Sequence, residues 1–347
     1  MPERTILEAE IHEQPDALRR LLEQGRDGAA AIADLIRRED VRYVVISSRG
    51  SSANAARYAQ YLLGRAHRVP VMHATPSLFT IYGQPPRLDG AAVIGISQSG
   101  ASPDVRAVLA EARRQRRPTI ALTNTPGSPL AREADAVLPL EAGEERAVAA
   151  TKTYLNSLGA VALLFAAADG ARAGSELDAM PDLLEEQIAL SEARAPRLDE
   201  FAGTVGATVI ARGVNYGTAF EIALKIRELT GLVVDAYSPA DLMHGPIAAI
   251  APGWPVILVA PSGPARASVQ ELVQPLRRRG ARLIVVSDDD ATLDSAHTRL
   301  RLVAGVPEWL SPLTAVVPGQ LAALRLAQLR GRSADSPAGL SKVTLTR

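Results

Sequence analysis

The sequence predicts an α/β protein made of two doubly wound domains in tandem, each built on a parallel sheet. Its 347 residues correspond to about two domains, and 47% apolar with 22% charged residues is the composition of an ordinary globular protein. Continuous runs of valine, isoleucine and leucine alternate with helical patterns, which is typical of parallel sheets covered by helices on both faces. Part of the chain also repeats at a fixed distance, so we expect the two domains to be copies of one another.

The repeat is present in two separate motifs. Arg49 and Arg212 each follow a short apolar run and precede a glycine, and they lie 163 positions apart (212 − 49). Gly100 and Gly263 end a second pair of apolar runs, again 163 positions apart (263 − 100). Two unrelated α/β units could share such turns, because glycine is common after a strand. A register held across both motifs favours a true repeat.

Helical patterns before and between the repeats organise the rest of the chain. An apolar stripe marks the first 30 or so residues, and a similar stripe runs from Glu176 to Ala195. The expected parts are an N-terminal helical segment at 1–34, a first domain at 35–170, a connecting helix at 171–199, a second domain at 200–332 and a C-terminal tail at 333–347.

Charge and cysteine content exclude several classes of function. Lysines plus arginines (38) equal aspartates plus glutamates (38), so no overall field attracts nucleic acid or an anionic membrane. There are no cysteines, which excludes disulfides, thiolate zinc sites and cysteine nucleophiles. The charged start resembles no signal peptide, and the longest apolar stretch, Ala160–Ala168, is too short for a membrane span. We therefore expect a cytoplasmic protein that binds neither nucleic acid nor membrane.

Two serine-rich turns are the first candidate binding site. Open parallel sheets bind ligands beyond the carboxyl ends of their strands, and there the first domain carries Ser47–Asn54 and Ser97–Ser102. Both turns lead into helices, whose free N–H groups favour an anion. Taken singly, Ser52 and Ser102 are more simply helix caps, but two such turns on neighbouring strand ends favour a compact anion such as a monophosphate. Neither a Walker pattern nor Gly-x-Gly-x-x-Gly is present, so no nucleotide cofactor is expected.

The second domain contains a narrow charged strip on an otherwise apolar helix. At 100° per residue, Glu221, Lys225 and Glu228 fall within about 60° of one another, whereas most other positions from Ala219 to Leu229 are apolar. Such a helix should be largely buried, with the strip lining a cleft in which Lys225 tunes Glu228 for proton transfer. The alternative is a salt bridge on a solvated face, and periodicity alone favours it.

His244 stands in a loop marked by the Gly-Pro pair that follows it. A side chain in such a loop can reach a ligand, and none of the other four histidines has this setting. A lone histidine in a loop is also commonly structural. No second histidine or paired carboxylate stands at metal spacing beside it, so no metal is expected.

These motifs resemble the sugar isomerase (SIS) family of phosphosugar-binding domains, whose domains are flavodoxin-like. Within it, the chain is most similar to the isomerase half of glucosamine-6-phosphate synthase (glutamine–fructose-6-phosphate aminotransferase) and to stand-alone glucosamine-6-phosphate deaminases. The similarity runs from Glu10 through nearly the whole chain. The motifs that carry it are Gly-Ser-Ser at 50–52, Ser-Gln-Ser-Gly-Ala-Ser at 97–102, Val-Ala-Ala-Thr-Lys at 148–152, Glu-Ile-Ala-Leu-Lys-Ile-Arg-Glu at 221–228, His-Gly-Pro at 244–246 and Leu-Ser-Lys at 340–342.

The resemblance implies a role for each motif. In the family, serine turns hold the sugar phosphate, a glutamate moves a proton between C1 and C2, a histidine opens the ring, and a lysine near the C-terminus forms a Schiff base with the open-chain ketose. The implied catalytic residues are Glu228, His244 and Lys342, and the implied substrate-binding residues are Ser52, Ser97, Gln98, Ser99, Ser102, Ala150, Glu221 and Lys225. The resemblance also implies a homodimer whose active site takes the histidine loop from the neighbouring subunit and is closed by the C-terminal tail.

Two departures from the synthase pattern shape the expected function. The synthase's N-terminal glutaminase domain, with its cysteine nucleophile, has no counterpart in this sequence, and Ala150 stands where the synthase has a serine. We therefore expect a metal-free, cofactor-free homodimer that converts glucosamine 6-phosphate to fructose 6-phosphate and ammonia. The alternatives are an aldose–ketose phosphosugar isomerase, a fructosamine-phosphate deglycase and, in another class, a non-catalytic phosphosugar sensor, which would need an output module that the sequence does not supply.

Overall fold

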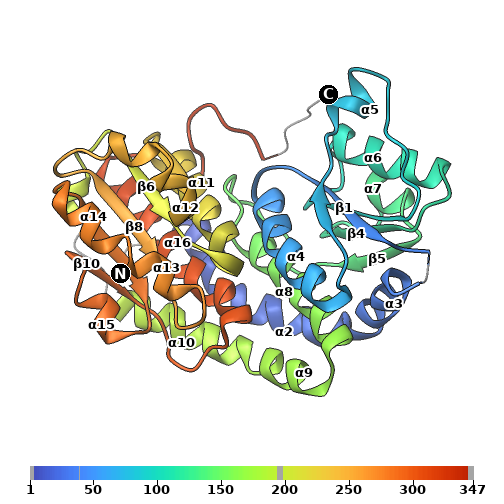
Figure 1. The fold of residues 1–347 in the computed structure, drawn as a ribbon, viewed down its shortest axis with the longest axis horizontal. Helices are drawn as coiled ribbons and strands as arrows, with labels where there is room; N and C mark the ends of the chain where they lie inside the picture. The colour runs from blue at the N-terminus through green and yellow to red at the C-terminus, as the bar shows by residue number, and fades with distance from the viewer. Residues whose placement is uncertain (1–3, 39, 194–197, 343–347) are drawn as a thin grey trace. The chain divides into compact units, whose positions relative to one another are not determined.

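A computed structural model describes residues 4–38, 40–193 and 198–342 of the chain, and its ribbon is shown in Figure 1. The described residues form two compact units. The N-terminal unit contains 14–38, 40–145, 152–181 and 341–342, and the C-terminal unit contains 4–13, 146–151, 182–193 and 198–340. Each unit has a five-stranded parallel sheet. The predicted class, two doubly wound α/β domains, is confirmed.

The sheet of the N-terminal unit has the strand order β2-β1-β3-β4-β5, which is the flavodoxin-like order. All its neighbouring strands are parallel, and every residue of β3 and β4 is buried, as expected where helices cover both faces. The strands are β1 (Tyr43–Ser48), β2 (Val71–His73), β3 (Ala91–Ile96), β4 (Thr119–Thr123) and β5 (Ala136–Pro139). The helices are α2 (Gln14–Gln24), α3 (Arg26–Ile36), α4 (Gly50–His67), α5 (Ser77–Thr80), α6 (Pro103–Arg114), α7 (Pro129–Arg132), α8 (Lys152–Asp169) and α9 (Ala171–Asp178).

The longest apolar stretch of the sequence lies in α8, at the centre of the N-terminal unit. Every residue of α8 from Lys152 to Ala166 is buried, because α2, α3 and α4 pack against it. Gly159 allows a close approach, since a Cβ there would lie 2.6 Å from Leu18 Cδ1. Across the described parts of the chain, no helix is both long enough and apolar enough to cross a membrane.

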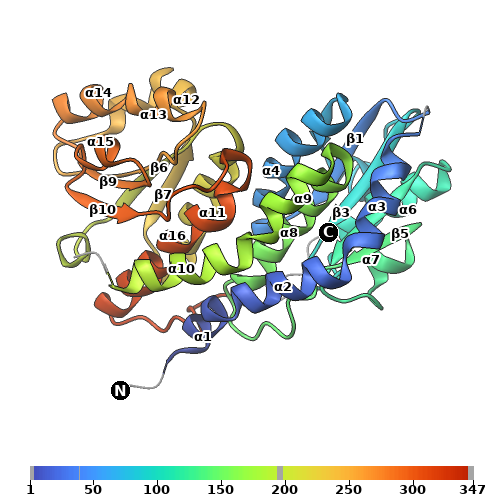
Figure 2. The same ribbon diagram turned by 90° about the horizontal axis from the view of Figure 1, so that it is seen from below.

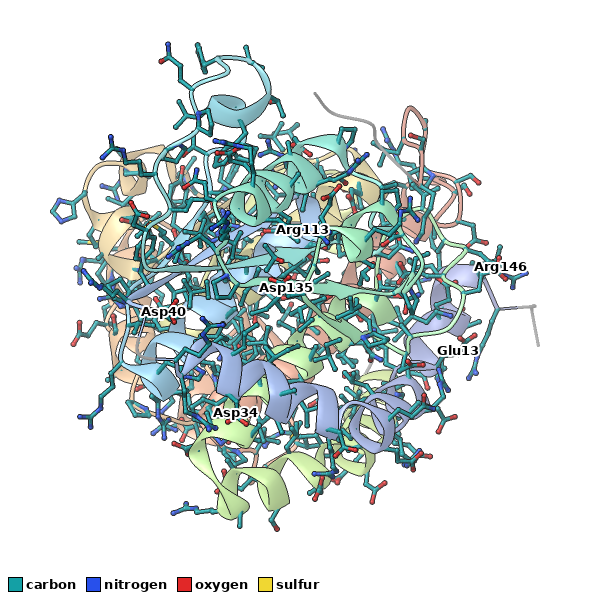
Figure 3. The ribbon with its side chains drawn as sticks, turned by 90° about the vertical axis from the view of Figure 1, so that its right-hand side faces the viewer. Glu13, Asp34, Asp40, Arg113, Asp135 and Arg146 are labelled. Carbon is teal, nitrogen blue, oxygen red and sulfur yellow. The ribbon has the colours of Figure 1, made fainter. Side chains whose placement is uncertain are left out.

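A carboxylate fixes the start of strand β4 beside β5. Asp135, which immediately precedes β5, accepts hydrogen bonds from the backbone N–H of Thr119 (2.9 Å) and from its hydroxyl (2.8 Å). Figure 3 shows Asp135 among the surrounding side chains. These bonds satisfy Thr119, which is fully buried.

The C-terminal unit repeats this architecture. Its strand order is β7-β6-β8-β9-β10, and its neighbouring strands are again all parallel. The strands are β6 (Gly206–Ile210), β7 (Val233–Tyr237), β8 (Pro255–Val259), β9 (Arg282–Ser287) and β10 (Thr298–Arg301). The helices are α1 (Ile6–His12), α11 (Tyr216–Thr230), α12 (Pro239–Met243), α13 (Arg266–Gln270), α14 (Val273–Arg278), α15 (Asp290–Leu293) and α16 (Ser311–Leu329), with short 3-10 turns at Asp199–Phe201, Gly213–Asn215, Pro246–Ala249 and Glu308–Leu310.

The internal repeat is confirmed down to single residues. Strands β1 and β6 begin 163 positions apart, and so do helices α6 and α13. Arg49 and Arg212 have nearly the same backbone angles, with φ of −138° and −133° and ψ of 159° and 157°. The glycine after each of them has a positive φ, 53° at Gly50 and 64° at Gly213. This left-handed conformation favours glycine at both turns.

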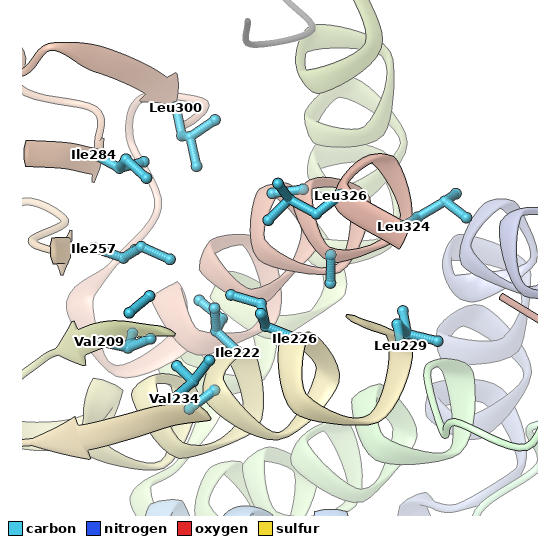
Figure 4. Close-up of a cluster of buried hydrophobic side chains, with 14 of the residues drawn as sticks. Val209, Ile222, Ile226, Leu229, Val234, Ile257, Ile284, Leu300, Leu324 and Leu326 are labelled. Carbon is cyan, nitrogen blue, oxygen red and sulfur yellow. The ribbon is translucent and has the colours of Figure 1, made fainter. Parts of the chain in front are cut away.

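The core of the C-terminal unit lies between its sheet and the helix pair α11 and α16, which lie side by side (Figure 2). Buried side chains of β6, β8 and β9 meet those of α11, as Figure 4 shows for Val209, Ile222 and Ile226. At Gly319 of α16, an added Cβ would lie 2.4 Å from Ile222. The glycine thus lets α16 close over α11.

The segment expected to be one connecting helix forms two helices, α9 and α10 (Met180–Ala193). The break falls at Ala179, just before Pro181. Proline has no N–H to continue a helix from the preceding turn but fits the first turn of a new one. The predicted boundaries of the domains stay predictions. The parts of the expected connecting helix at 194–197 and of the expected C-terminal tail at 343–347 lie outside the described residues.

Candidate active site

The two serine-rich turns begin side by side in the N-terminal unit. Strands β1 and β3 are paired with Ser48 opposite Ile96, so the turns that follow them start at the same edge of the sheet. Arg49, from the first turn, donates from Nε to Oδ2 of Asp104 in the first turn of α6, at 2.5 Å. Asp104 is 1% exposed. This ion pair ties the two turns together and leaves half of the arginine side chain exposed.

Neither Ser52 nor Ser102 caps its helix through its side chain. The N-cap of α4 is Arg49, and Ser52 lies within the first turn of that helix. Ser102 is the N-cap residue of α6, but its hydroxyl makes no capping hydrogen bond. Capping thus does not account for either hydroxyl. Both serines are half-buried at the edge of the sheet, where a ligand is expected to bind.

The other residues of the second turn hold its backbone in shape. The hydroxyl oxygen of Ser97 accepts from the N–H of Gly100 at 3.2 Å, and that of Ser99 accepts from the N–H of Ala101 at 3.3 Å. Each hydroxyl keeps its own proton for donation. The carbonyl of Gln98 accepts from the N–H of Asn124, which links the turn to the end of β4.

Gly100 is required at the centre of this turn. Its φ is 60°, and a Cβ built there would lie 2.0 Å from the hydroxyl oxygen of Ser128. Any larger residue would have to displace Ser128, which caps α7 through the N–H of Ala131. The glycine therefore sets the shape of the serine turn.

The charged strip on α11 is buried within the C-terminal unit. Glu221 is 0% and Lys225 1% exposed, whereas the Glu228 side chain is 24% exposed. Nζ of Lys225 lies 3.5 Å from Oε1 of Glu221 and 2.5 Å from Oε2 of Glu228. The shorter contact is an ion pair and not a well-directed hydrogen bond. The solvated salt bridge favoured by periodicity is wrong, because α16 and the sheet cover this helix.

His244 lies on an exposed loop of the C-terminal unit. Its backbone N–H closes helix α12 by donating to the carbonyls of Ala240 and Asp241, and the next residue, Gly245, has a φ of 133°. Its imidazole makes no hydrogen bond or ion pair within the described chain. The side chain is thus presented outward by a turn that the backbone holds.

Lys342 has a partner that the sequence did not reveal. Its Nζ lies 2.7 Å from Oε2 of Glu145, a residue of the same unit. Glu145 also accepts from the N–H and the hydroxyl of Thr153, at 3.1 and 2.7 Å. Burial raises the pKa of Glu145, but the Lys342 charge and these hydrogen bonds outweigh it and hold the pKa below its ordinary value. The only sequence signal was the position of Glu145 a few residues before the Val-Ala-Ala-Thr-Lys motif.

Comparison with known proteins finds one family on both sheets. The SIS domain family matches residues 35–167 and 207–330, one match on each sheet. The chain belongs to the SIS domain family.

Three relatives of this SIS chain are named for reactions of phosphosugars. It is 34% identical over 353 residues to the glutamine–fructose-6-phosphate aminotransferase (isomerizing) of Mycolicibacterium smegmatis, covering 96% of this chain and 56% of that protein. A candidate phosphosugar isomerase of Silicibacter pomeroyi has a TM-score of 0.85 at 30% identity, covering 96% of this chain and 100% of the other. A glucosamine-6-phosphate deaminase of Thermotoga maritima has a TM-score of 0.76 over 99% of this chain and 100% of the other; at 22% identity it shows the shared fold.

The predicted site residues of the SIS chain fall into two groups, one in each unit. Ser52, the turn at 97–102 and Lys342 belong to the N-terminal unit, and Glu221, Lys225, Glu228, His244 and Ala150 belong to the C-terminal unit. The contacts given above bring together the two serine turns and, in the other unit, Glu221, Lys225 and Glu228. They do not join Lys342 to the serine turns, or His244 and Ala150 to the strip on α11, and the meeting of all these residues at one substrate stays a prediction. Among the described residues, no cluster of three or more histidine, aspartate and glutamate side chains is arranged to hold a metal ion.

Proposed function

We propose that this SIS protein converts glucosamine 6-phosphate and water to fructose 6-phosphate and ammonia, as a homodimer. The observation that carries the proposal is the buried strip on α11, which holds the Glu228 carboxylate against a buried ammonium while leaving it partly exposed. Family membership supports phosphosugar chemistry, and the name of the aminotransferase relatives includes fructose 6-phosphate. The chain spans about 56% of the length of those relatives, so their activity is carried over here only as part of the proposal.

The serine turns are the proposed anchor for the sugar phosphate. The half-buried Ser99 and Ser102 precede the first turn of α6, and the half-buried Ser52 lies in the first turn of α4. Their hydroxyls are the proposed donors to the phosphate. The Arg49 guanidinium is joined to this edge by its ion pair with Asp104. Hydroxyl and N–H donors around a doubly charged phosphate form charge-assisted hydrogen bonds, which are stronger than neutral ones.

Glu228 is the proposed carrier of the proton between C2 and C1. A group in this role must stay within hydrogen-bond reach of both carbons. The contact with Lys225, itself held by Glu221 on the preceding turn, keeps the carboxylate close to the buried ammonium. After ring opening, transfer of the C2 proton to C1, together with a proton from the amino nitrogen to O1, turns the amino aldehyde into an imine at C2 with a hydroxymethyl group at C1.

His244 is the proposed ring-opening residue, supplied to the neighbouring subunit of a dimer. Ring opening moves a proton from O1 to O5, and imidazole both donates and accepts protons near neutral pH. The exposure of His244, with no side-chain partner among the described residues, fits a group that acts on the other subunit.

Lys342 is the proposed nucleophile that releases ammonia. Its amine adds to the C2 imine, ammonia leaves, and water then hydrolyses the resulting Schiff base to fructose 6-phosphate and free Lys342. The amine must first lose a proton, and the Glu145 carboxylate lies 2.7 Å from it as an acceptor.

The Lys342–Glu145 ion pair also favours a second candidate function, aldose–ketose isomerisation of a phosphosugar. In the observed arrangement Lys342 is engaged by a carboxylate, and isomerisation through an enediol needs Glu228 but no amine nucleophile. The two functions differ in their products, because only the deaminating reaction releases ammonia.

Incubation of the purified chain with glucosamine 6-phosphate tests the proposal. We expect ammonia and fructose 6-phosphate in equal amounts, and reduction with borohydride in the presence of fructose 6-phosphate should attach the sugar to Lys342. Ketose formed from an aldose phosphate without ammonia would select the isomerase instead. If no hexosamine 6-phosphate or hexose 6-phosphate yields either product, both enzymatic functions are refuted. The non-catalytic phosphosugar sensor is then the remaining alternative.

Mixing two inactive variants tests the shared dimer site. A mixed dimer of His244→Ala and Glu228→Gln subunits contains one site with both wild-type residues, if the histidine acts across the interface. With random exchange, half of the dimers are mixed and have one good site of two, so about a quarter of wild-type activity should return. No recovery despite confirmed subunit exchange would place His244 and Glu228 in the same subunit's site.

A further inference from the structure

The internal repeat places a second pair of turns at the carboxyl ends of β6 and β8, where β1 and β3 carry the serine turns. The corresponding residues, each 163 positions apart, are Arg49 and Arg212, Ser52 and Asn215, Ser97 and Ala260, Ser102 and Ala265, and Asp104 and Ala267. A small pocket lies at this place, lined among others by Arg212, Ala265, Arg266 and Glu308. This pocket, the copied site, has the position of the serine site but a different chemistry.

The copied site has kept one of the four hydroxyls of the serine site, because Ser262 corresponds to Ser99; its hydroxyl oxygen accepts from Nη1 of Arg266 at 3.2 Å. Ala260 and Ala265 have no hydroxyl, and the third changed position, Asn215, is 2% exposed. Its side chain is used inside the unit, where it donates to the hydroxyl oxygen of Ser311 at 2.7 Å and accepts from Thr218 at 3.2 Å. These changes remove three of the four hydroxyls that the serine turns carry at the corresponding positions.

The copied site has kept its arginine but has lost the aspartate that pairs with the arginine in the N-terminal unit. Arg49 pairs with Asp104 in the N-terminal unit, but the counterpart of Asp104 is Ala267. The exposed Arg212 side chain makes no hydrogen bond or ion pair with any described residue. The nearby Arg266, in contrast, is paired with Asp289 at 2.8 Å. The site therefore has one guanidinium without a fixed counter-charge.

A carboxylate of the chain itself reaches into this position. Oε1 of Glu308 accepts the backbone N–H of Ala265 at 2.9 Å. Its side chain packs on the turn, since a Cβ added to Gly263 would lie 2.6 Å from Glu308 Cγ. The φ of Gly263 is 147°, compared with 60° at Gly100, so the turn has a different shape where the carboxylate lies against it.

We infer that Glu308 supplies an internal anion to the copied site and thereby closes it to phosphate ligands. Its carboxylate takes an N–H that the turn would offer to a phosphate, and a phosphate placed beside it would meet a like charge in a partly buried site. The chain should then bind one phosphosugar, at the serine turns. Without Glu308, the free Arg212 and the Ala265 N–H would form an anion site.

Counting bound ligands on the full chain tests this inference. In isothermal titration with fructose 6-phosphate and with inorganic phosphate, the wild-type chain should bind one equivalent and Glu308→Ala should bind a second. Adding Arg212→Ala should weaken the second site at least tenfold, because a charge-assisted hydrogen bond is lost. Glu271→Ala, which removes an equal charge from an exposed position of the same unit, is the matched control and should still bind one equivalent.

The outcome does not depend on whether the serine turns bind phosphosugars. If they bind nothing, the wild-type chain takes no ligand and Glu308→Ala takes one, and the gain of one still supports the role of Glu308. If Glu308→Ala fails to fold, Glu308→Gln removes the like charge but keeps an acceptor for the Ala265 N–H, so we expect it to gain a second site that is weaker and still depends on Arg212. A wild-type chain that already fills a site dependent on Arg212, or folded Glu308 variants with no added site, would overturn the inference.

Discussion

Replacement of Glu228 by glutamine separates a catalytic role for this residue from a structural one. The substitution keeps the shape of the side chain and removes its basic oxygen. General acid–base catalysis contributes about 10²- to 10⁴-fold to turnover, which corresponds to about 3–5 kcal/mol of activation free energy. We expect kcat for glucosamine 6-phosphate to fall by that factor. The Kd for fructose 6-phosphate should change less than about threefold, because the proposed phosphate anchor is untouched.

The stability cost of the same substitution follows from the ion-pair distances. At an effective dielectric constant of about 20, the gross attraction to Lys225 is about 7 kcal/mol for Glu228 at 2.5 Å and about 5 kcal/mol for Glu221 at 3.5 Å. Desolvation of the buried ions offsets most of both values. Because Lys225 keeps Glu221 as a partner, we expect a net loss of about 1–2 kcal/mol. The melting temperature should then fall by about 2–8 °C.

Glu221→Gln is the matched control for this experiment. It removes an equal charge from the same lysine on the same helix, but the Glu221 side chain is 0% exposed, whereas that of Glu228 is 24% exposed. This burial is unfavourable for the direct substrate contact that the resemblance implies for Glu221. The substitution should cost similar stability and leave kcat within about tenfold of wild type. The assays are ammonia and ketose release, incorporation of solvent deuterium at C1 of the ketose, and thermal unfolding. If Glu228→Gln keeps wild-type turnover, or if both variants lose turnover equally, the assignment of Glu228 is refuted.

Two further substitutions test the phosphate anchor and the C-terminal lysine. Ser102→Ala should weaken phosphosugar binding about tenfold in titration calorimetry and leave the melting temperature unchanged, because its hydroxyl does not cap α6. The control Thr5→Ala removes a side-chain cap from α1, so it should lower the melting temperature and leave binding unchanged. Equal effects of the two variants on binding and on melting temperature would contradict the assignment of Ser102. Lys342→Met should lower the melting temperature most at neutral pH. The lysine helps hold the folded-state pKa of Glu145 below its ordinary value of 4.5. The ion pair's contribution to stability is therefore complete above pH 4.5 and is lost as the pH falls through the folded-state pKa. Melting curves from about pH 3 to 7 should therefore show the two proteins converging in acid, and a constant difference would contradict this origin.

The fold could be predicted largely because a doubly wound sheet requires only that each position be apolar or polar, and not that it hold one particular residue. Strand β8 is a continuous apolar run between turns, and any such run flanked by helical patterns fits a buried parallel strand. The repeat register added the correspondence of strands, since the 163-residue spacing between Arg49 and Arg212 holds at the starts of β1 and β6. The break between α9 and α10 was missed because Pro181 lies within an otherwise helical pattern.

The candidate site could be predicted by residue type but not by its partners. Arg49 and Asp104 are 55 positions apart, and Glu145 and Lys342 are 197 apart, so no local pattern connects them. Burial of the strip on α11 likewise depends on α16, which begins at Ser311, far along the chain. Helical periodicity gives the width of an apolar face but not what covers the polar strip beside it, and for that reason it favours a solvated salt bridge.

The two repeats show that a shared backbone conformation does not imply a shared binding site. Arg49 and Arg212 agree in φ and ψ to within about 5°, because the shape of a strand–turn–helix depends on the glycine that follows and on the buried strand that precedes it. What differs is a handful of side chains at the strand ends, some half-buried, such as Ser102 and Ala265, and some buried, such as Asp104 and Asn215. A pattern strong enough to predict the second sheet therefore carries no information about whether that sheet binds a phosphate. In our inference, phosphate binding at the second sheet is prevented by Glu308. The repeat register does not identify this residue, and its role follows from the contact of its carboxylate with the Ala265 N–H.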